Sequence, residues 1–232
     1  MVLLKEKVIL ITGAGRGIGR DFALACAKHG AKVVVNDYGA NTKGTDIEGS
    51  PASDVVNEIE AIGGCALADN SDVSNFSSVE EMFENTIKNF GKIDAVINNA
   101  GILRDKIFHK MSLDDWKAVI DVHLNGSFYV SRIAADHFRQ QEKGAFVHMT
   151  STSGLVGNFG QANYAAAKLG IEVGDPPVIT DDVDDWLTEN PGVKLSSREN
   201  YKKLLTLIDS KNLEDAYQAL SLLEPAFEAA QD

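Results

Sequence analysis

The stretch that decides the fold runs from Lys7 to Gly19 and reads KVILITGAGRGIG. Its first half is a continuous apolar run, the pattern of a strand buried on both faces of a parallel sheet. Its second half is a glycine turn with the spacing TGxxxGxG, and a helix is expected after it, from Arg20 to His29. A glycine cluster alone is often only a turn. Here the strand-to-helix context favours a dinucleotide site, because glycines let the backbone approach a pyrophosphate and the helix N-terminus offers free N–H groups.

The second expected strand, Lys32 to Asp37, ends in an acid. A carboxylate at this place accepts a hydrogen bond from an adenosine ribose 2′-hydroxyl and repels a 2′-phosphate. Asp37 therefore favours NAD over NADP. The alternative is a turn aspartate before Tyr38 and Gly39.

The next segments of the chain alternate between helical and strand patterns. We expect helices or strands over these ranges: helix 51–62, strand 65–69, helix 76–90, strand 93–97, helix 113–140 and strand 145–150. This β-α order predicts a doubly wound, Rossmann-like parallel sheet with the strand order 3-2-1-4-5 and right-handed crossovers.

Polar residues cluster after several of these strands. Asp72 and Val73 suit an adenine pocket, although a helix-capping role before residue 76 fits them almost equally well. The run from Asn98 to Gly101 suits a close approach to a cofactor at the carboxyl end of its strand. Asn125 lies in mid-helix beside a glycine, which is unfavourable by propensity and indicates a functional role or a kink. We interpret the nearby His123 as a structural residue.

A further stretch, STSGLVGNFGQANYAAAK (151–168), carries groups suited to proton transfer. Tyr164 and Lys168 are four residues apart, so on a helix they lie on one face. A cation beside a phenol stabilises the phenolate and lowers the pKa of the phenol, which prepares a tyrosine for acid–base work. Ser151 is placed to donate a hydrogen bond to the same substrate oxygen. The alternative is an ordinary amphipathic helix with Tyr and Lys on its surface.

Composition excludes several classes of protein. The 232 residues are 44% hydrophobic and 24% charged, as in globular domains, and no apolar run approaches the length of a membrane span. The net charge of −12 argues against binding to nucleic acid or anionic membranes. Cys26 and Cys65 lack metal spacing and indicate a reducing compartment, and we expect no metal site.

Five motifs together carry a family resemblance: TGAGRGIG (12–19), NNAG (98–101), Asn125, Ser151 and Tyr164-x-x-x-Lys168. In this order and spacing they resemble the short-chain dehydrogenase/reductase family over about residues 5–173. More narrowly, VVVNDYG, NNAGILRD, DVHLNGSF and GNFGQANYAAAKLG resemble the (3R)-hydroxyacyl-CoA dehydrogenase domain of peroxisomal multifunctional enzyme type 2 and its bacterial relatives.

The resemblance implies NAD as cofactor and an acyl-CoA as substrate, with oxidation of a 3-hydroxyacyl thioester to the 3-ketoacyl thioester. It implies that Tyr164 is the general acid/base, that Ser151 orients the substrate oxygen, and that Lys168 lowers the Tyr164 pKa and holds the nicotinamide ribose. It assigns Asn125 to a water relay from Lys168. The residues that it places along NAD are Gly13, Arg16, Gly17, Ile18, Asp37, Asp72, Val73, Asn99, Tyr164 and Lys168. Members of this family usually form oligomers, so we expect a homo-oligomer.

After Val173 the sequence changes character, so we predict two parts, residues 1–173 and an acidic helical tail, 174–232. The tail holds 13 acidic and 5 basic residues. The resemblance implies a sixth strand, a substrate lid and a seventh strand after residue 173. The tail sequence has no pattern that predicts any of them. We expect its amphipathic helices to cover the sheet edge or to bind a protein partner. A catalytically impaired protein with an interaction tail is therefore the alternative function. The C-terminus is no peroxisomal targeting tripeptide, which favours the cytoplasm.

Overall fold

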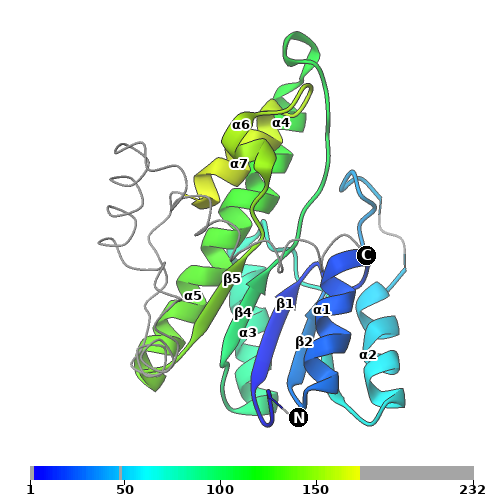
Figure 1. Cartoon of the computed structure of the whole chain (residues 1–232), viewed down its shortest axis with the longest axis vertical. Helices are drawn as coiled ribbons and strands as arrows, with labels where there is room; N and C mark the ends of the chain where they lie inside the picture. Colours follow the sequence, from blue (N-terminus) through cyan, green and yellow to red (C-terminus); the bar gives the residue numbers. More distant parts are fainter. Residues whose placement is uncertain (1–2, 47–48, 173–232) are drawn as a thin grey trace, which may run out of the picture. The chain divides into compact units, whose positions relative to one another are not determined.

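The computed structural model describes residues 3–46 and 49–172. Its centre is a five-stranded parallel sheet in the order β3-β2-β1-β4-β5 (Figure 1). The strands are β1 (Val8–Thr12), β2 (Lys32–Asn36), β3 (Cys65–Asp69), β4 (Ala95–Asn98) and β5 (Ala145–His148). The predicted fold class and strand order are confirmed.

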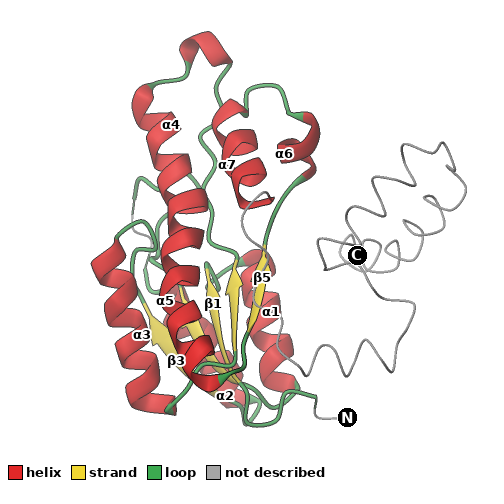
Figure 2. Cartoon of the chain, turned by 90° about the vertical axis from the view of Figure 1, so that its left-hand side faces the viewer, coloured by secondary structure: helices red, strands yellow, loops and turns green. Residues whose placement is uncertain are grey.

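Helices cover both faces of the sheet (Figures 1 and 2). The helices are α1 (Gly17–Lys28), α2 (Pro51–Ala61), α3 (Phe76–Phe90), α4 (Leu113–Ile120), α5 (Gly126–Gln141), α6 (Thr152–Val156) and α7 (Ala162–Glu172), with a 3₁₀ turn η1 (Phe108–Lys110) and a π turn η2 (Asp121–Asn125). One core cluster joins the sheet to α1 and α2, and a second joins its other face to α3 and α5.

The strand β1 explains why both clusters form. Ile9 and Ile11 belong to the cluster of α1 and α2, whereas Leu10 between them belongs to the cluster of α3 and α5. Neighbouring side chains of a strand point to opposite faces, so an unbroken apolar run suits a sheet that is covered on both sides.

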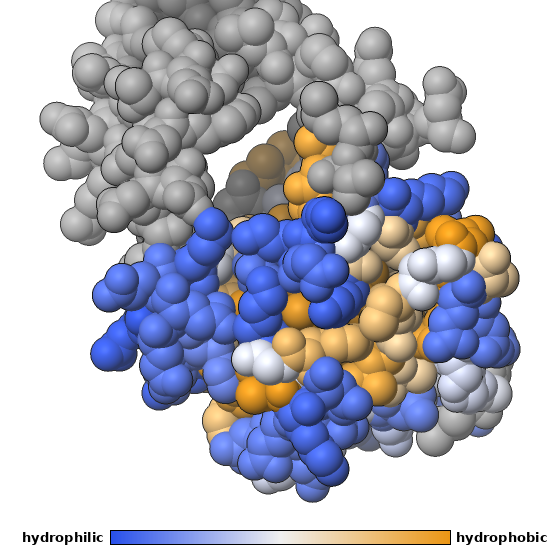
Figure 3. Space-filling view, turned by 90° about the horizontal axis from the view of Figure 1, so that it is seen from below, coloured by the Kyte–Doolittle hydropathy of each residue, from blue (hydrophilic) through white to orange (hydrophobic). Residues whose placement is uncertain are grey.

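Figure 3 views the molecule from below and shows hydrophobic residues in the centre of that face, with hydrophilic residues around them.

The helix predicted over 113–140 is interrupted in the structure. Ser112 caps it as expected, because its Oγ accepts a hydrogen bond of 3.0 Å from the Asp115 backbone N–H. The π turn η2 then separates α4 from α5 around Asn125. The unfavourable Asn-Gly pair thus coincides with a change in helix type at the boundary between η2 and α5. The short elements η1 and α6 were not predicted.

The predicted acidic tail, residues 174–232, lies outside the described residues, and so do the boundary after Val173 and the predicted absence of further strands. Among residues 3–46 and 49–172, no helix combines the length and the apolar character that a membrane span requires.

Candidate active site

Two glycines after β1 lie too close to other backbone atoms to carry a side chain, Gly13 in the turn and Gly19 in the first turn of α1. At Gly13, which has a positive φ of 62°, an added Cβ would lie 2.7 Å from the Cα of Ala100. At Gly19, an added Cβ would lie 2.2 Å from the carbonyl oxygen of Gly13. The side-chain amide of Asn99 fixes this contact, donating hydrogen bonds of 3.0 Å to the carbonyl oxygens of Thr12 and Gly13. The end of β4 thus holds the glycine turn in shape.

Asp37 is fixed against the same turn. Its Oδ2 accepts a hydrogen bond of 2.9 Å from the Gly15 N–H, and its Oδ1 accepts one of 2.9 Å from the Gly39 N–H. The second bond is that of a turn aspartate, and the first places the carboxylate beside the glycines. The two interpretations of Asp37 are therefore compatible in the structure.

Asp72 also combines two features. Its Oδ1 accepts hydrogen bonds from the backbone N–H (2.9 Å) and the hydroxyl (2.7 Å) of Ser74. The cap of α3 itself is Asn75, whose side chain accepts from the Ser78 N–H at 3.2 Å. Asp72 thus shapes the turn before the helix while it lines a cavity.

That cavity, of about 490 Å³, lies at the carboxyl ends of the strands. It brings together seven residues that the sequence assigned to the cofactor: Gly13, Arg16, Ile18, Asp37, Asp72, Val73 and Asn99. Gly17 stands beside them at the start of α1, where an added Cβ would meet no atom within 4 Å. Because ligands of doubly wound sheets bind at this edge, the cavity is the candidate cofactor site.

Ser151, Tyr164 and Lys168 come after β5 in the chain, Ser151 just before α6 and the other two within α7. Ser151 is the N-cap of α6, and its Oγ accepts from the Ser153 N–H at 3.2 Å. The Lys168 ammonium lies 5.6 Å from the centroid of the Tyr164 ring and donates to the Met149 carbonyl oxygen. Burial lowers the pKa of Lys168 from 10.5 to about 8. Lys168 is thus a buried cation beside the Tyr164 ring.

His123 is the residue that sequence reasoning missed as a neighbour of this pair. Its ring packs edge-on against Tyr164, with 5.2 Å between the centroids, and only 4% of the residue is exposed. Its Nε2 lies 3.0 Å from the Ile102 nitrogen and 2.9 Å from the Ile102 oxygen, and its Nδ1 has no partner among the described residues. Burial, and secondly the charge of Lys168, lower the pKa of His123 from 6.5 to about 4.

Asn125 makes a different contact. Its side-chain amide donates a hydrogen bond of 2.9 Å to Asp121 Oδ1, one turn back along the same segment. A π turn inserts a residue into the helix and rotates the residues after it, so regular helical spacing does not say which residue faces Tyr164. The unfavourable Asn-Gly pair in the sequence indicated an irregular helix at this point. It did not indicate that the His123 ring contacts Tyr164.

Asn125, Ser151, Tyr164 and Lys168 are not among the residues that line the cavity. A cavity of this kind, on a doubly wound fold that also carries a Tyr–Lys pair, is typical of an oxidoreductase that uses a nucleotide cofactor. The family model described as short chain dehydrogenase matches residues 7–173, and the chain belongs to this family.

The relatives and a solved structure agree with this family. A short-chain type dehydrogenase/reductase of Mycobacterium tuberculosis is 48% identical over 168 residues, which are 72% of this chain and 59% of that protein. Peroxisomal multifunctional enzyme type 2 of Mus musculus is 49% identical over 168 residues, 71% of this chain and 22% of that protein. The crystal structure of a short chain dehydrogenase from Mycobacterium avium matches with a TM-score of 0.67 and 43% identity, covering 73% of this chain and 60% of that one. The chain thus spans less than two thirds of the length of each of these three proteins.

Proposed function

We propose that the protein is an NAD-dependent oxidoreductase that interconverts a secondary alcohol and a ketone, with a 3-hydroxyacyl-CoA and the 3-ketoacyl-CoA as the substrate pair. The observation that carries the proposal is the buried Lys168 beside the Tyr164 ring, on a fold with a glycine-lined cavity at the carboxyl ends of its strands. The acyl-CoA assignment rests on the motifs NNAGILRD and GNFGQANYAAAKLG and on the likeness to peroxisomal multifunctional enzyme type 2.

The residues present fit a nicotinamide dinucleotide. Gly13 and Gly19 allow backbone approaches that any Cβ would block, and Gly17 leaves open space at the start of α1. Such a turn suits a pyrophosphate, which the N-terminus of α1 stabilises. Asp37 would accept the ribose hydroxyl hydrogen bond and repel a 2′-phosphate, which supports NAD over NADP. When bound, the cofactor supplies or accepts the hydride.

The residues of this chain handle the proton and the orientation of the substrate. In ketone reduction, the Tyr164 hydroxyl donates a proton to the carbonyl oxygen, and in alcohol oxidation it takes that proton back. Ser151 donates a hydrogen bond to the same oxygen. Loss of this proton turns the Tyr164 side chain into a phenolate. Lys168 stabilises that phenolate, because a cation lowers the energy of a nearby anion. Asn125 serves the proton relay from Lys168.

A second candidate is a dehydrogenase-fold protein without turnover whose tail serves interaction or assembly. The observation that favours it is that the family match ends at Val173, while the chain continues to Asp232. The two candidates differ in catalysis, not in cofactor binding.

Two measurements on the full chain test the proposal. Titration with NADH and with NADPH, followed by nicotinamide fluorescence, is expected to show tighter binding of NADH. Absorbance at the nicotinamide band should then fall when a 3-ketoacyl-CoA is added to protein and NADH. Saturable NADH binding without turnover of short, medium or long ketoacyl chains would favour the second candidate. Equal or tighter binding of NADPH would contradict the role of Asp37.

A further inference from the structure

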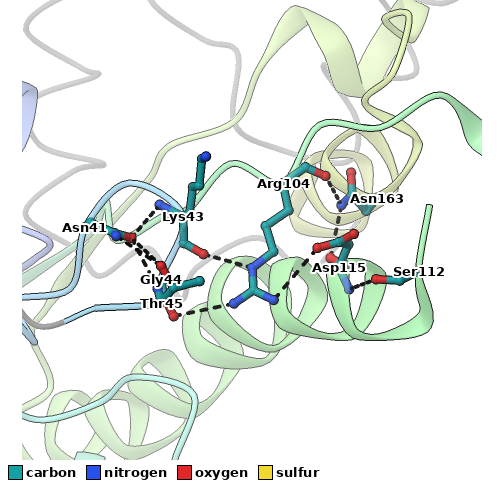
Figure 4. Close-up of polar contacts among 8 residues, drawn as sticks. All are labelled: Asn41, Lys43, Gly44, Thr45, Arg104, Ser112, Asp115 and Asn163. Atoms are coloured by element: carbon teal, nitrogen blue, oxygen red, sulfur yellow. Dashed lines mark hydrogen bonds and ion pairs between the residues drawn. The ribbon is translucent and has the colours of Figure 1, made fainter. Parts of the chain in front are cut away.

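Arg104 joins three separate segments of the structure (Figure 4). Its Nε donates a hydrogen bond of 2.8 Å to the Lys43 carbonyl oxygen, and its Nη2 donates one of 3.4 Å to the Gly44 carbonyl oxygen. Its Nη1 lies 3.9 Å from Asp115 Oδ1 on α4. The Arg104 side chain is 19% exposed, while its hydrogen bond to Lys43 lies at the surface.

The first segment, residues 41–46 after β2, is here named the Asn41 loop. Asn41 organises it from within, because its Oδ1 accepts from the Lys43 N–H at 3.0 Å and from the Thr45 N–H at 3.1 Å. Leu103, next to Arg104, donates a backbone hydrogen bond of 2.9 Å to the Thr42 carbonyl oxygen. The Asn41 loop is thus a compact unit that the segment after β4 holds from outside.

The same segment reaches the helix of Tyr164. Asn163 is fully buried, and its Nδ2 donates hydrogen bonds of 3.1 Å to the carbonyl oxygens of Arg104 and Asp115. Its Oδ1 accepts a hydrogen bond of 2.8 Å from the Tyr164 backbone N–H. Arg104 therefore connects two segments. Its side chain binds the Asn41 loop, and its backbone carbonyl oxygen accepts a hydrogen bond from Asn163 at the start of α7.

The Asn41 loop is a wall of the candidate cofactor cavity. Asn41, Thr42, Gly44 and Arg104 line it together with Asp37. A ligand bound beside Asp37 would have this loop next to its adenosine half. Release of such a ligand is then expected to require the loop to move outward, which breaks the contacts of Arg104.

We propose that Arg104 is a positioning residue that latches the Asn41 loop against the cofactor cavity and thereby slows release of the dinucleotide. The identity of the ligand rests on the proposed function, whereas the contacts between Arg104 and the Asn41 loop do not depend on it. The planar guanidinium serves two carbonyl oxygens and one carboxylate at once, which a single ammonium group does not reproduce in the same geometry. Arg104 is thus expected to change the rate at which the dinucleotide dissociates, without changing proton transfer by Tyr164.

The test compares full-length wild type with Arg104→Lys and Arg104→Ala. Arg132→Ala is the control, because it removes an exposed arginine paired with Asp136 within α5. Amide hydrogen exchange of the protein alone is expected to be about tenfold or more faster across residues 42–46 in Arg104→Ala, the scale of losing a charged hydrogen bond. Arg104→Lys should lie in between, and Arg132→Ala should match wild type.

Stopped-flow displacement of NADH supplies the second readout. NADH release is expected to be about tenfold faster in Arg104→Ala, with an association rate near that of wild type. The pH dependence of turnover should keep its midpoint, because Tyr164 and Lys168 are unchanged. If Arg104→Ala fails to fold, Arg104→Lys carries the same test with a smaller effect.

The outcomes separate the latch from the proposed function. Unchanged exchange in the Asn41 loop, or unchanged NADH release in folded variants, would overturn the latch. If wild type binds no NADH, the proposed function fails, and the exchange measurement still decides whether Arg104 holds the loop. Faster exchange over the whole chain would mark a general loss of stability and would also overturn the proposal.

Discussion

His123 should make the stability of the folded protein depend on pH in a defined window. Its pKa is about 4 in the folded state, against 6.5 as an ordinary histidine. The unfolded chain then binds more protons between these values, so the free energy of unfolding falls as the pH falls from 6.5 towards 4. Each pH unit in that window costs about 1.4 kcal/mol, and the full window costs about 3 kcal/mol. Above pH 6.5 the contribution of His123 is fully present.

The variant His123→Asn isolates this effect. Asn does not titrate, so it removes the pH-dependent part of the contribution while keeping a polar group near Ile102. Urea unfolding of both proteins between pH 5.5 and 8, followed by circular dichroism, gives the difference in unfolding free energy at each pH. We expect that difference to be constant above pH 7 and to shrink by about 1 kcal/mol at pH 5.5. A difference that stays constant down to pH 5.5 would refute the assignment of a buried, neutral His123.

Two further substitutions test the packing and charge of the same site. Gly101→Ala places a Cβ 2.4 Å from His123 Cε1, so it should lower the free energy of unfolding by about 1–3 kcal/mol, measured by urea unfolding, and an unchanged midpoint would contradict the packing. Lys168→Met should gain stability relative to wild type at pH 7, because burial lowers the Lys168 pKa to about 8 and keeping the ammonium charged in the folded protein costs free energy. This advantage should shrink as the pH rises from 8 to 10.5, where unfolded wild type binds the extra proton; thermal denaturation across that range checks the sign, and a constant gap would contradict it.

The pattern of strands and helices in the sequence was sufficient to predict the strand order of the sheet. The apolar run of β1 and the alternation of strands and helices led to the order 3-2-1-4-5, because few topologies satisfy right-handed crossovers. Asp37, Asp72 and Asn99 were also found from their places after strands, since parallel strands bring their carboxyl ends to one edge.

The surroundings of Tyr164 were harder to predict. The contact of His123 with Tyr164 depends on a π turn, whose inserted residue changes which side chain faces inward. The Arg104 contacts join residues about 60 positions apart through backbone carbonyls, and such pairing leaves no pattern in side-chain types. Asn99 was assigned to the cofactor from its position, whereas its hydrogen bonds to Thr12 and Gly13 join residues more than 80 positions apart and were not predicted.

The most direct test of the central claim is the initial rate of NADH oxidation with a saturating 3-ketoacyl-CoA, in wild type and in Tyr164→Phe. The change removes one hydroxyl and keeps the ring that packs against His123. Loss of general acid catalysis is expected to lower the turnover rate about 10²- to 10⁴-fold while NADH binding stays within a few-fold of wild type. Turnover by Tyr164→Phe at the wild-type rate would contradict the account, because the proton would then come from a group other than Tyr164.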